Sequence, residues 1–501
     1  KATEYLQKAL VITTEIGDRK EEGFCYGQLG AVFKSLGQYD KAKEYLQKAL
    51  VITTEIGDRN GERTCYGNLG TVNVFQSLGQ YDKAKEYLQK ALVITTEIGD
   101  RNGERTCYGN LGTVFQSLGR YDKAKEYLQK ALLIATEIGD REAVGSCYVN
   151  LRVVFESLGH YDKAKEYLQK ALAITSEIGD RRGEGSCYLN LGTVLQSLGQ
   201  YDKAKKYLQK ELTIRTAIGE LNGEGICYVN LGTVLQSLGQ YDKAKEYYQK
   251  ALVILTETGD REAVGSCYEN LGTVFQSLGL YDKEYYQKAL VISTEIGDRG
   301  GEGSCYGNLG AVFKSLGQYD MAIEYLQKAL AIIIEIGDRK EEGSCYGNLG
   351  TVFRLPGQYD KAKEYLQKAL VIATEIGDKN GEGSCYGNLG TVFHSIGQYD
   401  EAKEYFKEAL LITTEIDNRE GEGSCYANLG SVFESLGQYD KAKEYLQKAL
   451  VIATEIDHRK GEAGDYGNLG IIFRIFGDYE ASEVYLEKAL SIPRDIGGRR
   501  F

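Results

Sequence analysis

The chain has 501 residues, a net charge of −12 and only two prolines, Pro356 and Pro493. Its composition does not shift along its length, so neither a Pro- or Ser-rich linker nor a bilayer-length apolar stretch divides it. The weak acidity is spread evenly and excludes a basic phosphate-binding stripe. We therefore expect no nucleic-acid partner, no membrane insertion and no signal peptide.

The predicted elements begin in the middle of a repeat. Residues 1–20 hold one helix, at 1–18, which has the pattern of the second half of a repeat. The chain starts at Lys1, and its only methionine is Met321. We therefore expect this sequence to be a piece of a longer polypeptide.

A Cys-Tyr pair marks an internal period of 40 residues. One interval is lengthened to 42 by the insertion Asn73–Val74, and another is shortened to 38 by a deletion after Lys283. A twelfth copy carries Asp465 in place of the cysteine. The recurring cysteines are Cys25, Cys65, Cys107, Cys147, Cys187, Cys227, Cys267, Cys305, Cys345, Cys385 and Cys425.

Each period predicts a helical hairpin. We number residues 23–62 as positions 1 to 40 and carry this numbering through the other copies. Apolar residues at positions 3, 4, 7, 10, 11 and 14 predict a first helix, and those between positions 20 and 34 predict a second. Gly37 and Gly57 favour helix ends, while Asp40 and Asp58 favour an N-cap or an acid in the first turn.

Together the hairpins predict an all-α solenoid. Each hairpin has an apolar stripe wider than its two helices can cover, so the remainder is buried only against the next hairpin. Residues 21–501 are therefore expected to form twelve tandem hairpins in one solenoid. With the leading helix this gives about twenty-five helices.

The residues at positions 4, 7, 8, 11, 20, 24 and 27 resemble the tetratricopeptide repeat pattern over essentially the whole chain. The unit exceeds the family's common length of about 34 residues and lacks its usual proline. Its Ile-Gly-Asp-Arg and Asn-Leu-Gly signatures resemble a branch that includes LGN/Pins, rapsyn and tetratricopeptide repeat protein 28, without the Gα-binding motifs of LGN-type proteins. The resemblance implies a right-handed α-α superhelical solenoid with a concave groove lined by the first helices. In the third hairpin the pattern residues are Tyr108, Leu111, Gly112, Phe115, Ala124, Leu128 and Ala131.

The cysteines and glycines do not predict chemistry. No two cysteines are closer than 38 residues, which argues against a zinc site. The spacing of neighbouring hairpins disfavours disulfides, so we expect reduced, buried thiols and a reducing, cytoplasmic compartment. The run Gly301-x-Gly303-x-x-x-Gly307 has no preceding strand and is assigned to helix packing. We expect no metal, no cofactor and no catalytic residues, and therefore no enzyme.

Position 6 is the first candidate for binding. Asn is a poor residue in helix interiors because its side chain competes for backbone hydrogen bonds, yet it recurs here. Its carboxamide both donates and accepts, so it can clamp a peptide unit of an extended ligand, as this position does in the resembled family. The alternatives are a bond to the next hairpin, or copying of a recently duplicated unit. The residues are Asn68, Asn110, Asn150, Asn190, Asn230, Asn270, Asn308, Asn348, Asn388, Asn428 and Asn468.

Two runs of variable residues predict specificity within the groove. Position 5, usually Gly, and position 12, usually Gln, each change in three successive hairpins. The position-5 run is Val149, Leu189 and Val229. The position-12 run is Lys314, Arg354 and His394. We interpret these runs as an apolar and a basic patch, the latter suited to an acidic partner segment; drift on a solvated surface is the alternative.

Two substitutions disturb the core pattern. Arg152 replaces the close-packing Gly of position 8, and we expect it to point out of the helix contact or to widen it. Glu211 replaces the small Ala of position 27, and Arg215 at i+4 can pair with it.

The function that fits these features best is a protein-binding scaffold or adaptor that holds an extended segment of a partner protein in a concave groove. One alternative is a substrate-presenting or regulatory repeat region of a larger signalling or enzyme protein whose other domains lie outside this sequence. A second is a purely structural spacer or self-associating array.

Overall fold

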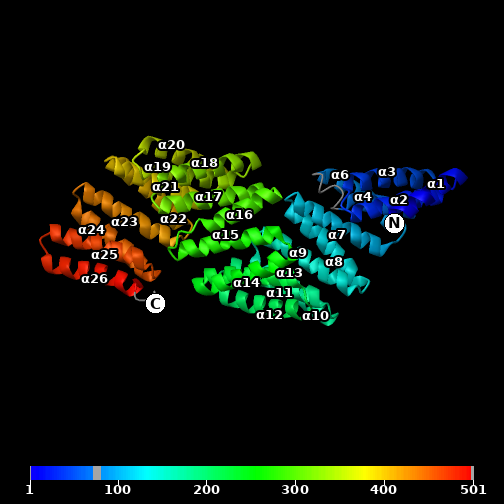
Figure 1. Ribbon diagram of the computed structural model, residues 1–501, viewed down its shortest axis with the longest axis horizontal. Coiled ribbons are helices and arrows are strands. Elements are labelled where there is room, and N and C mark those ends of the chain that lie inside the picture. Colours follow the sequence, from blue (N-terminus) through cyan, green and yellow to red (C-terminus); the bar gives the residue numbers. More distant parts are fainter. Residues whose placement is uncertain (1, 72–79, 498–501) are drawn as a thin grey trace. The chain divides into compact units, whose positions relative to one another are not determined.

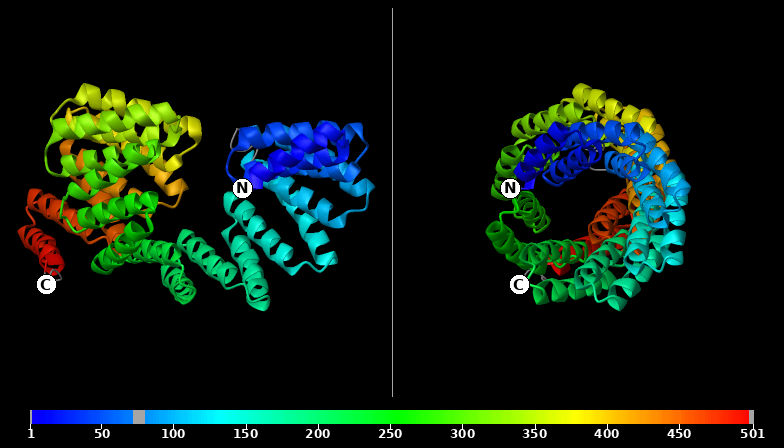
Figure 2. Two further views of the ribbon diagram at one scale, coloured as in Figure 1. Left: turned by 45° about the vertical axis from the view of Figure 1, so that its right-hand side comes forward. Right: turned by 90° about the vertical axis from the view of Figure 1, so that its right-hand side faces the viewer.

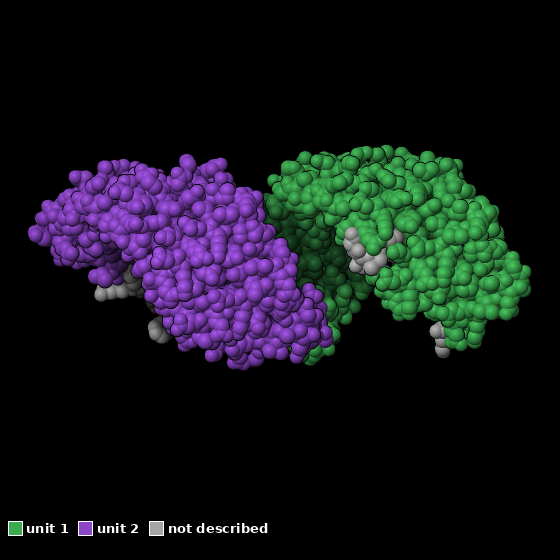
Figure 3. Space-filling view, turned by 90° about the horizontal axis from the view of Figure 1, so that it is seen from above, with its two compact units in different colours: residues 1–258 green, residues 259–501 purple. Residues whose placement is uncertain are grey.

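The computed structural model describes residues 2–71 and 80–497, and the Asn73–Val74 insertion lies outside this range. The chain divides into two compact units, residues 1–258 and 259–501, which Figure 3 colours green and purple. Among the described residues there are twenty-five helices and no strand (Figure 1).

The first unit contains the leading helix α1 and hairpins whose first helices are α2, α4, α7, α9, α11 and α13. Its helices are α1 (Ala2–Ile16), α2 (Arg19–Ser35), α3 (Tyr39–Glu55), α4 (Arg59–Gly70), α6 (Tyr81–Glu97), α7 (Arg101–Ser117), α8 (Tyr121–Glu137), α9 (Arg141–Ser157), α10 (Tyr161–Glu177), α11 (Arg181–Ser197), α12 (Tyr201–Ala217), α13 (Leu221–Ser237) and α14 (Tyr241–Thr258).

The second unit has the same plan, and its first helices are the odd-numbered ones from α15 to α25. Its helices are α15 (Arg261–Ser277), α16 (Glu284–Ile296), α17 (Arg299–Ser315), α18 (Tyr319–Ile336), α19 (Arg339–Arg354), α20 (Tyr359–Ile376), α21 (Lys379–Ser395), α22 (Tyr399–Glu415), α23 (Arg419–Ser435), α24 (Tyr439–Glu455), α25 (Arg459–Ile475) and α26 (Tyr479–Gly497).

Within each unit, successive helices pack against one another in chain order (Figures 1 and 2). The two helices of a hairpin share the most extensive contacts, and the second helix of one hairpin also packs on the first helix of the next. First helices of neighbouring hairpins touch as well, for example α19 with α21 and α21 with α23. The predicted all-α solenoid of tetratricopeptide-type hairpins is therefore confirmed.

The predicted turn signals form the ends of the helices. Gly57 has φ +71°, and Asp58 donates its backbone N–H to the carbonyl of Thr53 at 2.9 Å, which closes α3 with a Schellman-type turn. The side chain of Asp58 then accepts from the backbone N–H of Gly61 at 3.0 Å, so it caps α4 as predicted. Asp40 lies in the first turn of α3, where its negative charge interacts favourably with the positive end of the helix dipole.

A close contact between Gly and Leu holds the two helices of each hairpin together. A Cβ atom built on Gly310, at position 8 of α17, would lie 2.7 Å from Cγ of Leu326 in α18 and 3.3 Å from the carbonyl oxygen of Ala322. Leu326 and Ala322 are buried, as are their equivalents in most other hairpins. Glycine at this position therefore lets the two backbones approach closely enough to exclude water.

Aromatic rings extend this core to one side. In the third hairpin Phe115 stacks on Tyr127 with ring centroids 5.2 Å apart, and Tyr108 lies 6.0 Å from the same tyrosine. Lys130 lies 5.3 Å from the centre of the Tyr127 ring and pairs with Glu126 at 2.6 Å. This arrangement recurs in most hairpins, so it supports the repeat itself.

The two disturbed core positions are accommodated by local ion pairs. The side chain of Arg152 is 15% exposed and pairs with Glu156 at 2.7 Å, one turn further along α9. Glu211 is 1% exposed and pairs with Arg215 at 3.5 Å, as predicted. Burial raises the pKa of Glu211 to about 7.

The deletion after Lys283 shortens the second helix of its hairpin. Helix α16 begins at Glu284 and has 13 residues, whereas α18 has 18. Residues 281–283 are not helical, so the deletion removes the first turn of the helix. The core end of α16 is preserved, because Tyr286 and Ala289 remain fully buried.

Two glycines one turn apart in α17 should respond in opposite ways to alanine. Around Gly307, at position 5, an added Cβ would meet nothing within 4 Å. We expect Gly307→Ala to stabilise the fold by up to about 1 kcal/mol, because Ala has the higher helix propensity. Gly310→Ala should destabilise it by about 1–3 kcal/mol, because Leu326 must move. Urea unfolding midpoints test this, and shifts of the same sign would contradict it.

Asp465 should make the last hairpin sensitive to pH. It is 5% exposed in the cysteine slot, and burial raises its pKa to about 7 from an ordinary value near 3.8. A raised pKa in the folded state means that its contribution to stability is complete below about pH 3.8 and is lost as the pH rises to about 7. Asp465→Cys should therefore stabilise the protein by about 4 kcal/mol at pH 8 and by little at pH 4.

Thermal unfolding at several pH values measures this difference. Asp465→Asn is the control, because it keeps the shape of the side chain and removes the charge. This variant should lose the part of the pH dependence that the carboxyl causes. If the stability difference between the unchanged protein and Asp465→Asn stays constant from pH 4 to pH 8, the carboxyl does not titrate in this range.

Candidate peptide-binding groove

Cavities built from the same repeat positions lie between the first helices of neighbouring hairpins. Three of them have volumes of about 310, 280 and 240 Å³. Each is lined by positions 2, 5 and 6 of one first helix, by position 31 of the following second helix, and by positions 2, 3 and 6 of the next first helix. The hollow face is therefore a property of the repeat.

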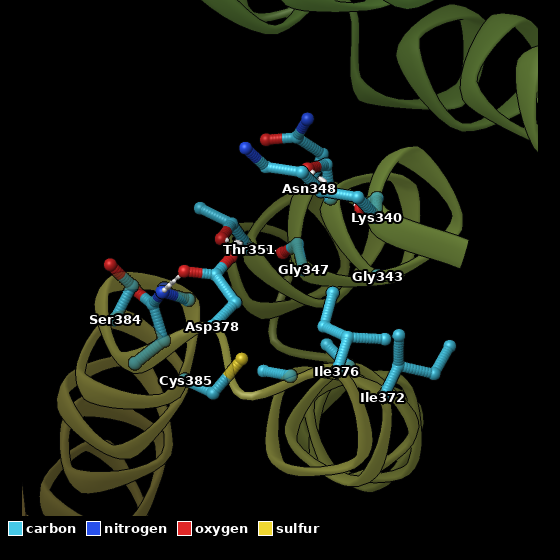
Figure 4. A pocket seen from close by; sticks show the side chains of 15 residues that line it. Lys340, Gly343, Gly347, Asn348, Thr351, Ile372, Ile376, Asp378, Ser384 and Cys385 are labelled. Carbon is cyan, nitrogen blue, oxygen red and sulfur yellow. Dashed lines mark hydrogen bonds between the residues drawn. The ribbon is translucent and has the colours of Figure 1, made fainter. Parts of the chain in front are cut away.

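The largest of these cavities lies between α19 and α21 (Figure 4). Asn348 and Thr351 project from α19 toward the space, and Ser384 and Asp378 border it from the side of α21. The floor is apolar, with Ile372 of α20 among its residues. The cavity thus combines an apolar floor with amide, hydroxyl and carboxylate groups at its rim, a mixture suited to polypeptide backbone and small side chains.

The Asn residues at position 6 border these cavities in pairs. Asn348 and Asn388 line the first, Asn150 and Asn190 the second, and Asn68 and Asn110 the third. Asn348 is exposed and the other ten are half-buried. Among residues 2–71 and 80–497, no protein group hydrogen-bonds the side chain of any of the eleven, in contrast to the alternative of a bond to the next hairpin.

The glycines at position 5 leave open space beside this Asn row. An added Cβ would meet nothing within 4 Å at Gly27, Gly67, Gly109, Gly307 or Gly387. Packing therefore does not require glycine at position 5, in contrast to position 8. The lack of a side chain exposes helix backbone and keeps the cavities deep.

The three apolar residues at position 5 are all half-buried. Val149 lines the second cavity together with Asn150. Leu189 packs partly against a buried cluster that includes Leu195 and Leu208, so some of its surface belongs to the core. Val229 lies at the equivalent place on α13, and none of the three described cavities includes it or Leu189.

The three basic residues at position 12 lie in the last turns of α17, α19 and α21. All are half-buried, and none lines the three cavities. Within the described part of the chain, Lys314 and Arg354 have no hydrogen bond or ion pair, whereas Nε2 of His394 lies 3.1 Å from Oγ of Ser435. A positive charge in the last turn of a helix also interacts favourably with the negative end of the helix dipole, which is a structural reason for these residues.

Side chains at position 12 are poorly solvated in two other hairpins. Burial lowers the pKa of Lys34, which occupies it in the first hairpin, and burial raises the pKa of Glu434, which occupies it in the eleventh. The charges of these two residues are therefore held in an environment that disfavours them.

One acidic residue at position 5, which lines the cavities in other hairpins, was missed from the sequence. Glu269 occupies position 5 of α15, directly after the Val, Leu and Val run. Its carboxylate accepts a hydrogen bond from Oγ of Ser304 at 3.3 Å and from Sγ of Cys305 at 3.2 Å, both on α17. Burial raises the pKa of Glu269. An alignment of position 5 over all hairpins shows that Glu269 replaces the usual Gly, so the sequence already marked this residue as an exception.

The eleven cysteines are free and buried, which confirms the prediction of unpaired thiols in a small slot. Burial raises the pKa of Cys107 and of Cys385 to about 11, so both are thiols at neutral pH. Among the described residues no three His, Cys, Asp or Glu side chains come together as a metal site would require. None of the helices described is both long and apolar enough to cross a membrane.

The repeat geometry agrees with a comparison against known families. The family model described as Tetratricopeptide repeat matches residues 1–55, 26–91, 66–137, 105–177, 148–217, 223–284, 283–335, 306–375, 341–415 and 422–495. These matches cover most of the chain, so the protein belongs to the tetratricopeptide repeat family. Such repeats generally mediate protein–protein interactions and are typically non-enzymatic. A search of curated proteins gave no match.

The chain is similar to several solved structures at low sequence identity. BtubC (BKLC) from P. vanneervenii is 22% identical with a TM-score of 0.39, over 43% of this chain and 91% of that one. A STAND (signal transduction ATPase with numerous domains) protein with a tetratricopeptide repeat sensor, from Pyrococcus horikoshii, is 20% identical with a TM-score of 0.51, over 70% of this chain and 52% of that one. A putative kinesin light chain from Podosopora anserina is 19% identical with a TM-score of 0.35, over 38% and 94%.

Proposed function

We propose that the protein is a scaffold that binds an extended segment of a partner protein along the face hollowed by these cavities. The observation that carries the proposal is the row of position-6 carboxamides. They border the cavities in pairs, and no protein group in the described residues satisfies them. A carboxamide can donate to a carbonyl and accept from an N–H of the same peptide unit, so a row of them can hold a backbone without reading its sequence.

Backbone clamping alone would bind weakly. Each hydrogen bond exchanged with water contributes only about 0.5–1.5 kcal/mol net, and ordering the segment offsets part of that. Side-chain anchors must therefore supply much of the affinity and the selectivity. In the first unit Val149, Leu189 and Val229 offer apolar contact. In the second, Lys314, Arg354 and His394 favour acidic side chains.

Several finer assignments belong to this proposal. We assign the chain to the 40-residue branch that includes LGN/Pins, rapsyn and tetratricopeptide repeat protein 28, on the signatures Ile98–Arg101 and Asn110–Gly112. The division into a leading helix at 1–20 and one solenoid of twelve hairpins at 21–501 stays a prediction. So do a cytoplasmic location, suggested by eleven unpaired thiols, and the absence of a nucleic-acid partner.

The alternative function is a regulatory or substrate-presenting repeat region of a larger signalling or enzyme protein. The STAND protein from Pyrococcus horikoshii is described as an ATPase with a tetratricopeptide repeat sensor, and this chain covers 52% of it. The coding sequence on both sides of this chain would separate the two functions. A catalytic domain adjoining the repeats would favour the alternative.

The carboxamide row is tested by replacing three neighbouring members. Peptides that bind the protein can be selected from a random dodecapeptide library, and those that protect α17, α19 and α21 from hydrogen exchange are retained. Asn308→Ala, Asn348→Ala and Asn388→Ala combined should weaken binding to every retained peptide by roughly 10- to 100-fold, because backbone bonds are lost. Fluorescence anisotropy measures the affinities.

The matched control removes three carboxamides from the second helices. Gln287, Gln327 and Gln367 are exposed at position 25, outside the groove, and their combined replacement by Ala should leave affinity unchanged. Full affinity in the triple-Asn variant would mean that peptides bind at another surface.

The basic patch should select acidic peptides in a salt-sensitive way. Replacing Lys314, Arg354 and His394 by Gln, the usual residue at position 12, should weaken acidic peptides roughly 3- to 30-fold at low salt. Peptides without acidic residues should bind as before. Equal losses for both peptide classes would contradict a charge-reading role.

Lysines on the second helices provide the control for net charge. Lys288, Lys328 and Lys368 lie outside the groove, where each pairs with a glutamate four residues earlier. Their combined replacement by Gln removes at least as much positive charge but should change the affinity for acidic peptides by less than about twofold.

A further inference from the structure

Glu269 is an acid that the fold does not need at its position. Position 5 is glycine in most hairpins and Val or Leu in three, so a carboxylate is not required for packing there. Glu269 is half-buried on α15, and its two hydrogen-bond donors, Ser304 and Cys305, are both neutral. Among the residues that the structure describes, no Lys, Arg or His pairs with it.

The surroundings of Glu269 leave its charge uncompensated. Asp298, the N-cap of α17, adds a negative charge nearby, and burial raises the pKa of Glu269. A thiol is a weak hydrogen-bond donor, so the bond from Cys305 compensates little of the lost hydration. A cation would form a charge-assisted bond that is stronger than either existing contact.

The two existing bonds could instead serve to join α15 to α17. Most neighbouring first helices pack without such a bond, because Gly at position 5 has no side chain to form one. A role in joining helices would change stability on substitution, and it would not change which ligands bind. The two roles can therefore be separated by experiment.

We propose that Glu269 is a subsite for a cationic side chain, Lys or Arg, of the bound partner segment. This inference rests on the proposed binding groove and adds a requirement on the partner. The segment combines one basic residue with acidic residues that meet Lys314 and Arg354, so it is a mixed-charge peptide rather than a uniformly acidic one.

The repeat geometry fixes the spacing between these charges. The carboxylate of Glu269 reaches Ser304 and Cys305, at positions 2 and 3 of α17. Lys314 lies on the same helix at position 12, so it is displaced from Cys305 by about 14 Å along the axis at about 1.5 Å per residue. An extended chain advances about 3.3 Å per residue. The basic and acidic residues of the segment are therefore about four residues apart.

The test selects a random dodecapeptide library on the full chain and on three variants. On the unchanged protein, we expect peptides with a Lys or Arg about four residues from an Asp or Glu. Glu269→Gln and Glu269→Val should abolish the preference for the basic residue and keep that for the acidic one. Glu269→Lys should replace the preference for a basic residue by a preference for a second acidic residue. Val is the matched control for folding, since Val149 and Val229 occupy the same position.

Affinities of one selected peptide then quantify the contact. Changing its basic residue to Gln should weaken binding roughly tenfold to the unchanged protein, and by less than about twofold to Glu269→Gln. Melting temperatures of all variants are measured alongside.

The outcomes separate this inference from the proposed function. If peptides are selected but show no basic preference, or keep it in Glu269→Gln, the subsite is wrong and the groove stands. If Glu269→Gln only lowers the melting temperature, the residue joins helices instead. If no peptide binds, the groove itself fails and the subsite with it.

Discussion

The structure depends on one close contact, in which a glycine of the first helix receives a leucine of the second. At Gly310 and Leu326 the distance leaves no room for a methyl group. The same contact recurs in hairpin after hairpin, with Tyr248, Tyr286 or Phe406 in place of leucine. Because this contact lies between the helices of a hairpin, it fixes the distance between them. The outer side of the first helix is therefore not needed for packing within the hairpin.

That freedom explains why function and stability separate on the first helix. Positions 7, 8, 10 and 11 belong to the core, and the buried cysteine of position 3 also borders the cavities, whereas positions 5, 6 and 9 line the cavity between α19 and α21. Gly307 and Gly310 illustrate the difference within one turn: the same residue type faces open space in one case and a buried leucine in the other. Substitutions at positions that face open space, such as that of Gly307, change the surface without destabilising the hairpin.

The periodic part of the fold could be predicted from the sequence, whereas the exceptions could be predicted only in part, as in the pairing of Glu211 with Arg215. Hairpins, capping by Asp58 and buried cysteines follow from patterns repeated many times. Arg152 was expected to point out of its helix contact or to widen it, and its pairing with Glu156, one turn along the same helix, was not foreseen. Glu269 was overlooked since its importance lies in its neighbours on α17, which are 35 and 36 residues away along the chain.

Recurrence of nearly identical cavities has a thermodynamic consequence for any ligand that uses only their common residues. A segment that fits one pair of cavities fits the next pair equally well, so the bound state is a set of registers shifted by one hairpin. Such degeneracy favours binding statistically by RT ln N, about 0.4 kcal/mol for two registers and about 1 kcal/mol for five. It also leaves the position of the ligand undefined. The few residues that break the period remove this degeneracy, and a ligand that contacts them is held in a single register.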